Sequence, residues 1–150
     1  MPAIDPNGLP NDVDLLQKIV AELCERRTGR TGIEGDKDPM DICVLSEKAF
    51  AHGGFFLHAR PIGGLRMIDG READDKIIAV LESDVAFGKF SEIQDVPQGL
   101  IDRLKHYFLS YKQLPSETEK RVEIVDVYDR VEAMDVITRS LRDYETEFSR

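Results

Sequence analysis

The chain has 150 residues, of which 41% are hydrophobic and 33% are charged, a balance that predicts one globular domain with a real core. Its net charge of −9 argues against a nucleic-acid partner, because the phosphate backbone attracts positive surfaces. No apolar run approaches the roughly 18 residues that cross a bilayer, and the acidic N-terminus does not resemble a signal peptide. We therefore expect a cytoplasmic protein with no membrane partner.

The first third of the chain predicts an irregular lead, a helix and a polar loop. Residues 1–11 hold prolines and a glycine, whereas apolar side chains recur at helical spacing over residues 12–27. The polar segment 28–41 enters the apolar run Ile42–Leu45, which we expect to be a short buried strand. Cys43 lies in this run and is expected to be a small core residue, because two cysteines are too few for a disulfide framework.

The middle of the chain alternates strand signals with turns. A turn is expected at 52–54, followed by an extended segment over 55–68 with a bulge or bend at Gly63-Gly64. An acidic turn at 69–75 leads into a strand at 76–81. Sequential strands joined by short turns indicate an antiparallel sheet or a small barrel.

The last third predicts helix, strand and helix. Apolar residues form a stripe over 97–112, and residues 121–128 read as a strand. Asp129 and Glu132 then have the spacing of a capping box that opens the last helix. The resulting order of elements predicts an α+β domain that occupies residues 1–150 as a single unit.

Two acidic clusters abut the expected strands. The first contains Glu34, Asp36, Asp38 and Asp41; the second contains Asp69, Glu72, Asp74 and Asp75, followed by Lys76. Carboxylates this close repel one another, and hard oxygen ligands suit Mg²⁺ or Mn²⁺. Solvated acidic turns are the alternative, and spacing alone leaves both interpretations open.

Other candidate residues carry weaker signals. Tyr111-Lys112 ends the second expected helix, where a cation also simply complements the helix dipole. His52, His58 and His106 lack metal-ligand spacing and are expected on the surface. The sequence contains no EF-hand, P-loop, dinucleotide-binding or nucleophile-elbow pattern.

Three ordered blocks resemble those of one enzyme family. The run Asp36-Lys-Asp38-Pro39-Met-Asp41 resembles the D-G-D-P-x-D signature of soluble (family I) inorganic pyrophosphatases. Residues 60–80 and Tyr107–Lys112 are similar to two later blocks of that family, and the resemblance covers about residues 20–147. It implies Mg²⁺-dependent hydrolysis of pyrophosphate to two phosphates, with Mn²⁺ as a possible substitute, in a small OB-like antiparallel β-barrel flanked by helices.

The resemblance also assigns roles to residues. Its metal ligands would be Asp36, Asp41, Asp69 and Asp74. Its catalytic residues would be Asp38, which orients or deprotonates the attacking water, and Lys76. Its phosphate contacts would be Lys76, Tyr111 and Lys112.

The chain departs from the family pattern in two places. Lys37 stands where the signature has glycine, and residues 1–12 do not match the family's N-terminal strands, which supply a further glutamate, lysine, arginine and tyrosine. We therefore expect an incomplete barrel with an open edge, a homo-oligomer, and Mg²⁺ binding with weak or absent turnover. The alternative function is a non-catalytic metal- or phosphate-binding homologue that acts as a structural or regulatory subunit.

Overall fold

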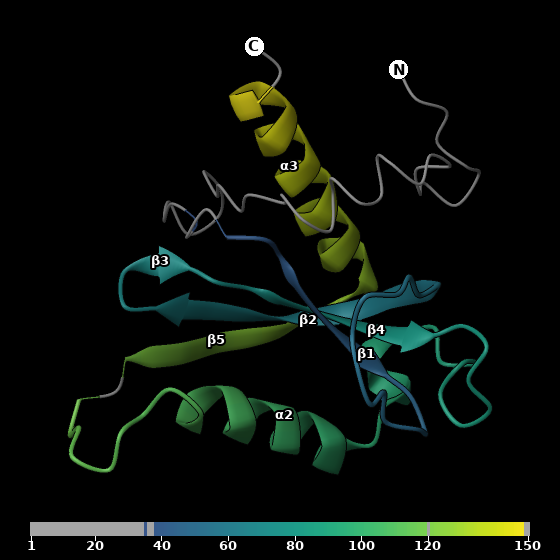
Figure 1. The fold of residues 1–150 in the computed structure, drawn as a ribbon, viewed down its shortest axis with the longest axis horizontal. Helices are drawn as coiled ribbons and strands as arrows, with labels where there is room; N and C mark the ends of the chain where they lie inside the picture. Colours follow the sequence, from purple (N-terminus) through teal and green to yellow (C-terminus); the bar gives the residue numbers. More distant parts are fainter. Residues whose placement is uncertain (1–34, 36–37, 120, 149–150) are drawn as a thin grey trace.

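The computed structural model describes residues 35, 38–119 and 121–148 (Figure 1). The helix expected over residues 12–27 lies outside this part of the chain. The described elements are β1 (Asp41–Leu45), β2 (Ala59–Asp69), β3 (Glu72–Ala73), β4 (Lys76–Leu81), the 3-10 helix η1 (Ile93–Asp95), α2 (Gln98–Ser110), β5 (Val122–Asp129) and α3 (Arg130–Phe148).

The five strands of the described part form one mixed sheet around β2. β4 and then β3 pair with one edge of β2, and β5 pairs with the other edge, all in antiparallel orientation. β1 adds to the outer edge of β4 and runs parallel to it. The expected α+β class is confirmed, and the sheet that the described strands form does not close into a barrel. The parallel pairing of β1 with β4 differs from the expected antiparallel pattern. It arises because β4 lies between β1 and β2, so that β1 does not pair with the strand that follows it in the chain.

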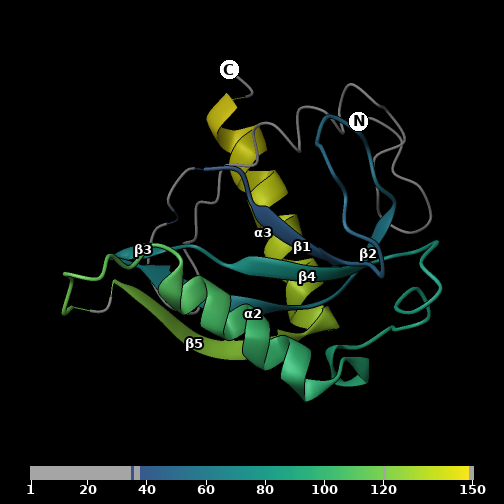
Figure 2. The same cartoon turned by 60° about the horizontal axis from the view of Figure 1, so that its bottom comes forward.

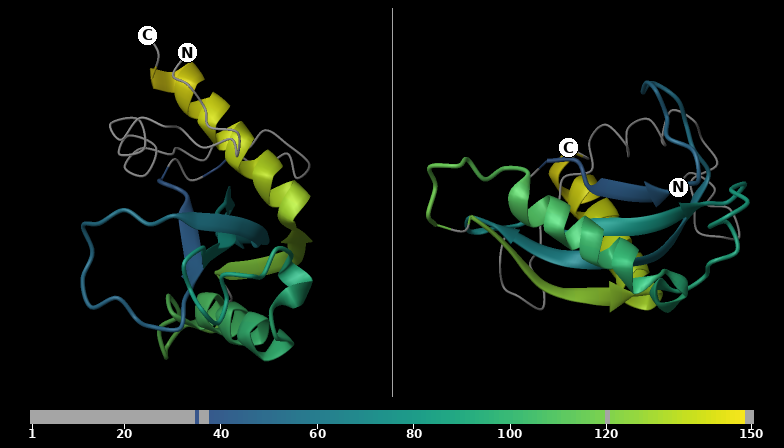
Figure 3. Two further views of the ribbon diagram at one scale, coloured as in Figure 1. Left: turned by 90° about the vertical axis from the view of Figure 1, so that its right-hand side faces the viewer. Right: turned by 90° about the horizontal axis from the view of Figure 1, so that it is seen from below.

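The alternation of side chains along β4 builds a core on each face of the sheet. Ile78 and Val80 join the larger cluster, which includes residues of η1 and α2. Ile77 points the other way and joins the cluster that contains Ala133 and Val136 of α3. The two helices therefore cover opposite faces of the sheet, as Figures 2 and 3 show.

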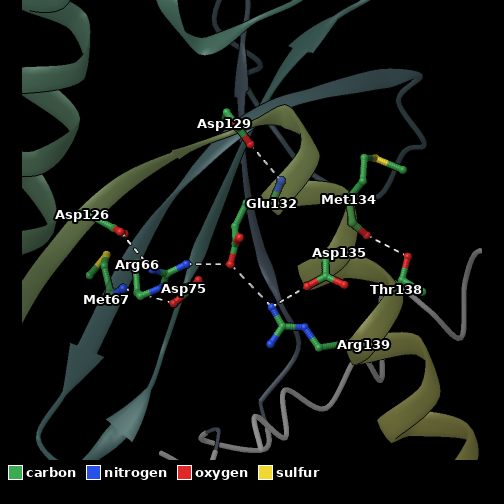
Figure 4. A network of polar contacts seen from close by, with 10 residues as sticks. All are labelled: Arg66, Met67, Asp75, Asp126, Asp129, Glu132, Met134, Asp135, Thr138 and Arg139. Carbon is green, nitrogen blue, oxygen red and sulfur yellow. Dashed lines mark hydrogen bonds and ion pairs between the residues drawn. The ribbon is translucent and has the colours of Figure 1, made fainter. Parts of the chain in front are cut away.

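Polar contacts fix α3 to the sheet (Figure 4). The backbone N–H of Glu132 donates to Asp129 Oδ1 at 2.9 Å, so the predicted cap is present at the start of this helix. The Arg66 side chain on β2 donates to Glu132 at 2.7 Å and to Asp126 on β5 at 2.9 Å. Arg66 and Glu132 are each only 13% exposed, so this pair joins β2 to α3 at a largely buried point.

Several boundaries match the sequence-based expectations, and others shift. β4 begins and ends as predicted, and the pairing of β2 with β4 is irregular between Pro61 and Gly63, next to the expected bulge. The strand expected from residue 55 begins at Ala59, and the expected turn at 69–75 includes the two-residue strand β3. None of the helices in the described residues is both long and apolar enough to cross a membrane.

Candidate functional site

Two groups of oppositely charged side chains lie at one end of the sheet. The first, which we call the β1–β4 cluster, consists of Asp41, Asp74 and Lys76. Lys76 Nζ donates to Asp41 Oδ2 and to Asp74 Oδ1, both at 2.6 Å. The parallel register places Asp41 opposite Lys76, and Asp74 lies two residues earlier and therefore faces the same side. The two carboxylate oxygens thus meet on a single ammonium group.

The β1–β4 cluster is buried at Lys76 and open to solvent at Asp41. The side chain of Lys76 is 2% exposed and that of Asp41 is 63% exposed, so the cluster reaches solvent on the Asp41 side. Burial alone would lower the pKa of Lys76, but the hydrogen bonds to Asp41 and Asp74 outweigh it and raise that pKa. The ammonium also lies 5.6 Å from the ring centroid of Phe108 on α2. Lys76 is therefore a fixed positive charge.

The second group, the β2–β5 cluster, consists of Asp69, Lys112 and Arg121. Asp69 Oδ2 accepts from Lys112 Nζ at 2.5 Å, and Asp69 Oδ1 accepts from Arg121 Nε at 2.6 Å. Burial acts to raise the pKa of Asp69, but the two cations hold it below its usual value. The hydrogen bond to Asp69 raises the pKa of Lys112, with a further contribution from a hydrogen bond with Tyr111. One carboxylate thus holds two cations.

The two clusters face the same side of the sheet. Met67 on β2 packs in the α2-side core, and Asp69 follows it by two residues, so both side chains point toward α2. On β4, Lys76 precedes the core residue Ile78 by two residues, so these two side chains also point toward α2. Phe108 of α2 contacts Lys76, whereas Lys112, four residues later, contacts Asp69. The backbone N–H of Asp74 donates to the carbonyl of Met67, two residues before Asp69, so the two clusters are neighbours on this face.

The remaining candidate residues occupy less informative positions. Asp36 and Lys37 lie outside the described residues, so neither the metal-ligand role of Asp36 nor the effect of Lys37 can be placed. Asp38 is exposed and lies three residues before β1. Tyr111 ends α2, is 45% exposed, and stacks on Tyr107 with ring centroids 5.1 Å apart.

Among the described residues, no three His, Cys, Asp or Glu side chains are arranged to hold a metal ion together. Asp41 and Asp74 meet in one cluster, and Asp69 lies in the other. His52, His58 and His106 are exposed, as expected.

Arg121 is a site residue that the motifs did not indicate. It stands one residue before β5, next to the acidic end of β2, because Val122 pairs with Asp69. The contact between Arg121 and Asp69 spans 52 residues of sequence. The available signal was a basic residue at the start of a strand, which becomes informative only once the partner strand and its register are known.

Comparison with known proteins places this chain in a family. The family model described as inorganic pyrophosphatase matches residues 20–145. The chain belongs to the inorganic pyrophosphatase family. The resemblance carried by the three sequence blocks is thereby confirmed, and the two charged clusters fall inside the matched region.

Individual relatives agree with the family assignment. The chain is 49% identical to the inorganic pyrophosphatase of Chlamydia caviae over 125 residues, which are 81% of this chain and 58% of that protein. The inorganic pyrophosphatase structure from Thermus thermophilus is 31% identical, with a TM-score of 0.66 over 73% of this chain and 63% of that one. The structure from Schistosoma japonicum supports the fold alone, with a TM-score of 0.73 at 24% identity over 85% of this chain and 46% of that one. The chain thus spans about three fifths of the length of the Chlamydia relative.

Proposed function

We propose that this chain hydrolyses inorganic pyrophosphate to two phosphates in a reaction that depends on Mg²⁺, with Mn²⁺ as a substitute. The observation that carries the proposal is the pair of neighbouring clusters, in which Lys76 and Lys112 are each held by carboxylates on one face of the sheet. A site for a metal–pyrophosphate complex needs carboxylates for the metal and cations for the phosphates. Relatives named inorganic pyrophosphatase favour hydrolysis over a non-catalytic subunit.

The donor set fits a hard divalent ion. Asp41, Asp69 and Asp74 offer only carboxylate oxygens, and each already contacts a positively charged group. Together with Asp36, they would hold Mg²⁺ through the kind of oxygen ligand that this ion prefers. When bound, divalent metal supplies an acidified water and neutralises charge on the departing phosphate.

The chain's own residues then perform three tasks. Asp38, exposed just before β1, accepts the proton of the attacking water. Lys76 and Lys112 hold phosphoryl oxygens through ammonium groups that are charged at neutral pH. The Tyr111 hydroxyl donates a further hydrogen bond to phosphate from the end of α2. Together these groups bind the anion and position the nucleophile.

A homo-oligomer is the assembly that the described surface supports. Within the described residues β1 pairs only with β4, so its other edge carries free backbone donors and acceptors. Ile42 on β1 and Phe55, Phe56 and Leu57 in the loop before β2 are exposed apolar side chains. We propose that a second copy of the chain covers this edge and loop.

The test of the enzymatic proposal is release of phosphate from pyrophosphate by the purified chain. We expect release that requires Mg²⁺ and stops when a chelator removes the metal. Asp38→Asn should lower the rate on the order of 10²-fold or more, because it removes the proton acceptor, while circular dichroism shows an unchanged fold. The control is Asp102→Asn, which alters an exposed carboxylate on α2. Phosphate release at the same rate with and without Mg²⁺, or an unchanged rate in Asp38→Asn, would contradict the proposal.

A further inference from the structure

Arg121 is fixed beside Asp69 by its backbone as well as by its side chain. Its carbonyl oxygen accepts from the backbone N–H of Gly70 at 2.9 Å, in the turn that follows β2. The next residue, Val122, pairs with Asp69 in the antiparallel ladder. The position of Arg121 next to the Asp69 carboxylate is therefore set by the β2–β5 register and does not depend on a chance surface contact.

The Arg121 side chain keeps most of its donors available. Only Nε donates to Asp69, and the side chain is 66% exposed. Its two terminal NH₂ groups make no hydrogen bond or ion pair with the described residues. A guanidinium in this state presents a planar fork of N–H donors, which matches two oxygens of a phosphate.

The shared carboxylate brings Arg121 close to the proposed phosphate contacts. Lys112 and Arg121 bind the two oxygens of the same Asp69 carboxylate, at 2.5 and 2.6 Å. A rotation about the side-chain bonds of Arg121 would therefore bring its guanidinium to an anion bound by Lys112. Lys112 Nζ lies 5.5 Å from the ring centroid of Tyr111, which places this third group beside the contact between Lys112 and Asp69.

We propose that Arg121 is a further substrate-binding residue, whose guanidinium contacts a phosphate of pyrophosphate together with Lys112 and Tyr111. This assignment rests on the proposed function. A purely structural role for Arg121 predicts little effect of its removal, because exposed ion pairs contribute little to stability. A substrate-binding role predicts a loss of affinity for phosphate with the fold intact.

The experiment compares four versions of the 150-residue chain: wild type, Arg121→Ala, Arg121→Lys and Arg103→Ala. Arg103 is exposed on α2 and makes no hydrogen bond or ion pair with the described residues, so its removal controls for the loss of one positive charge. Two quantities are measured: the Kd for inorganic phosphate by calorimetry in the presence of Mg²⁺, and KM and kcat for pyrophosphate. Thermal unfolding reports on the fold of each variant.

We expect Arg121→Ala to raise the phosphate Kd and the KM about tenfold, the effect of losing a charge-assisted hydrogen bond. The kcat should change less than the KM. Arg121→Lys should recover part of the affinity, because it keeps the charge and loses the fork. Arg103→Ala should match the wild type, and all four proteins should unfold at similar temperatures.

Three results would overturn the assignment. The first is a wild-type chain that binds phosphate or turns over pyrophosphate while Arg121→Ala keeps the same Kd and KM. The second is an equal loss in Arg103→Ala, which would indicate a general charge effect. The third is a loss of affinity that follows a lowered unfolding temperature, which would indicate a structural role. A wild-type chain that neither binds phosphate nor hydrolyses pyrophosphate would instead overturn the proposed function itself, and the assignment with it.

Discussion

The carboxylate of Asp84 connects two loops that are distant in the sequence. Asp84 accepts hydrogen bonds from the backbone N–H groups of Glu47, Phe87 and Ala86 at 2.7, 2.8 and 2.9 Å. It thereby joins the loop after β1 to the turn after β4. The bond from Glu47, followed by that from Phe87, holds the pKa of Asp84 below its usual value of 3.8.

The lowered pKa of Asp84 predicts a defined pH dependence of stability. A carboxyl group with a depressed folded-state pKa stabilises the protein above its unfolded pKa, and that contribution is lost as the pH falls through the folded value. In urea unfolding, Asp84→Asn should therefore be less stable than the wild type near pH 7, and the difference should shrink below about pH 4. Glu123→Gln, an exposed change on β5, serves as the control. A difference that stays constant over this range would show that the charge of Asp84 has no role.

At the residue scale, the sequence was informative where the chemistry is local. Cys43 is half-buried against the α2-side core, and burial raises its thiol pKa to about 11, which agrees with the expected small core residue. Asp41, Asp74 and Lys76 stand near each other in two motif blocks and do meet. The sequence motifs do not indicate Arg121, because its contact with Asp69 depends on the pairing of β2 with β5, which are distant in the chain.

At the scale of elements, periodicity located the main helices and strands, but pairing partners required the structure. The parallel alignment of β1 with β4 could not be read from strand signals, because short turns favour antiparallel neighbours. β3 is too short to leave a periodic signal. The bulge near Gly63-Gly64 was predictable, because glycine inside a strand pattern indicates close approach of another group. Here that group is Tyr128 of β5.

The close approach at Gly64 gives a stability prediction. A Cβ atom on Gly64 would lie 2.4 Å from the Tyr128 ring, which is buried against α3 and cannot move without disturbing that core. Gly64→Ala should lower the free energy of unfolding by about 1–3 kcal/mol, measured by urea denaturation. Gly53→Ala places the same methyl group in open space, and it should change stability by less than about 0.5 kcal/mol. Equal effects of the two substitutions would refute the packing argument.

At the scale of the whole molecule, charge and apolar surface are unevenly distributed. Among the described residues, two groups of paired charges lie at the end of the sheet formed by the start of β4 and the end of β2, and another group joins the sheet to α3. The loop between β1 and β2 projects from the sheet (Figure 3). Phe55 and Phe56 in this loop are exposed. Exposed apolar groups near a strand edge that is unpaired among the described residues are typical of an association surface.

This surface predicts self-association in solution. Static light scattering at roughly 10–100 µM, a range that covers the affinity of moderate interfaces, should give the mass of a dimer or a larger oligomer. A double variant with Phe55→Ser and Phe56→Ser should shift the mass toward the monomer, because it removes apolar area from the loop. Val85→Ser, at a residue that is 89% exposed elsewhere, is the matched control. A monomer at every concentration would rule out the proposed assembly.

The central claim is that the β1–β4 and β2–β5 clusters form one site for a metal–pyrophosphate complex. Its most direct test is calorimetric titration of the wild-type chain with imidodiphosphate, a pyrophosphate analogue with an uncleavable bridge, in the presence and absence of Mg²⁺. The account predicts binding at least about tenfold tighter with Mg²⁺, because the metal offsets repulsion between the carboxylates and the anion. Equal affinity with and without Mg²⁺, or no binding under either condition, would contradict it.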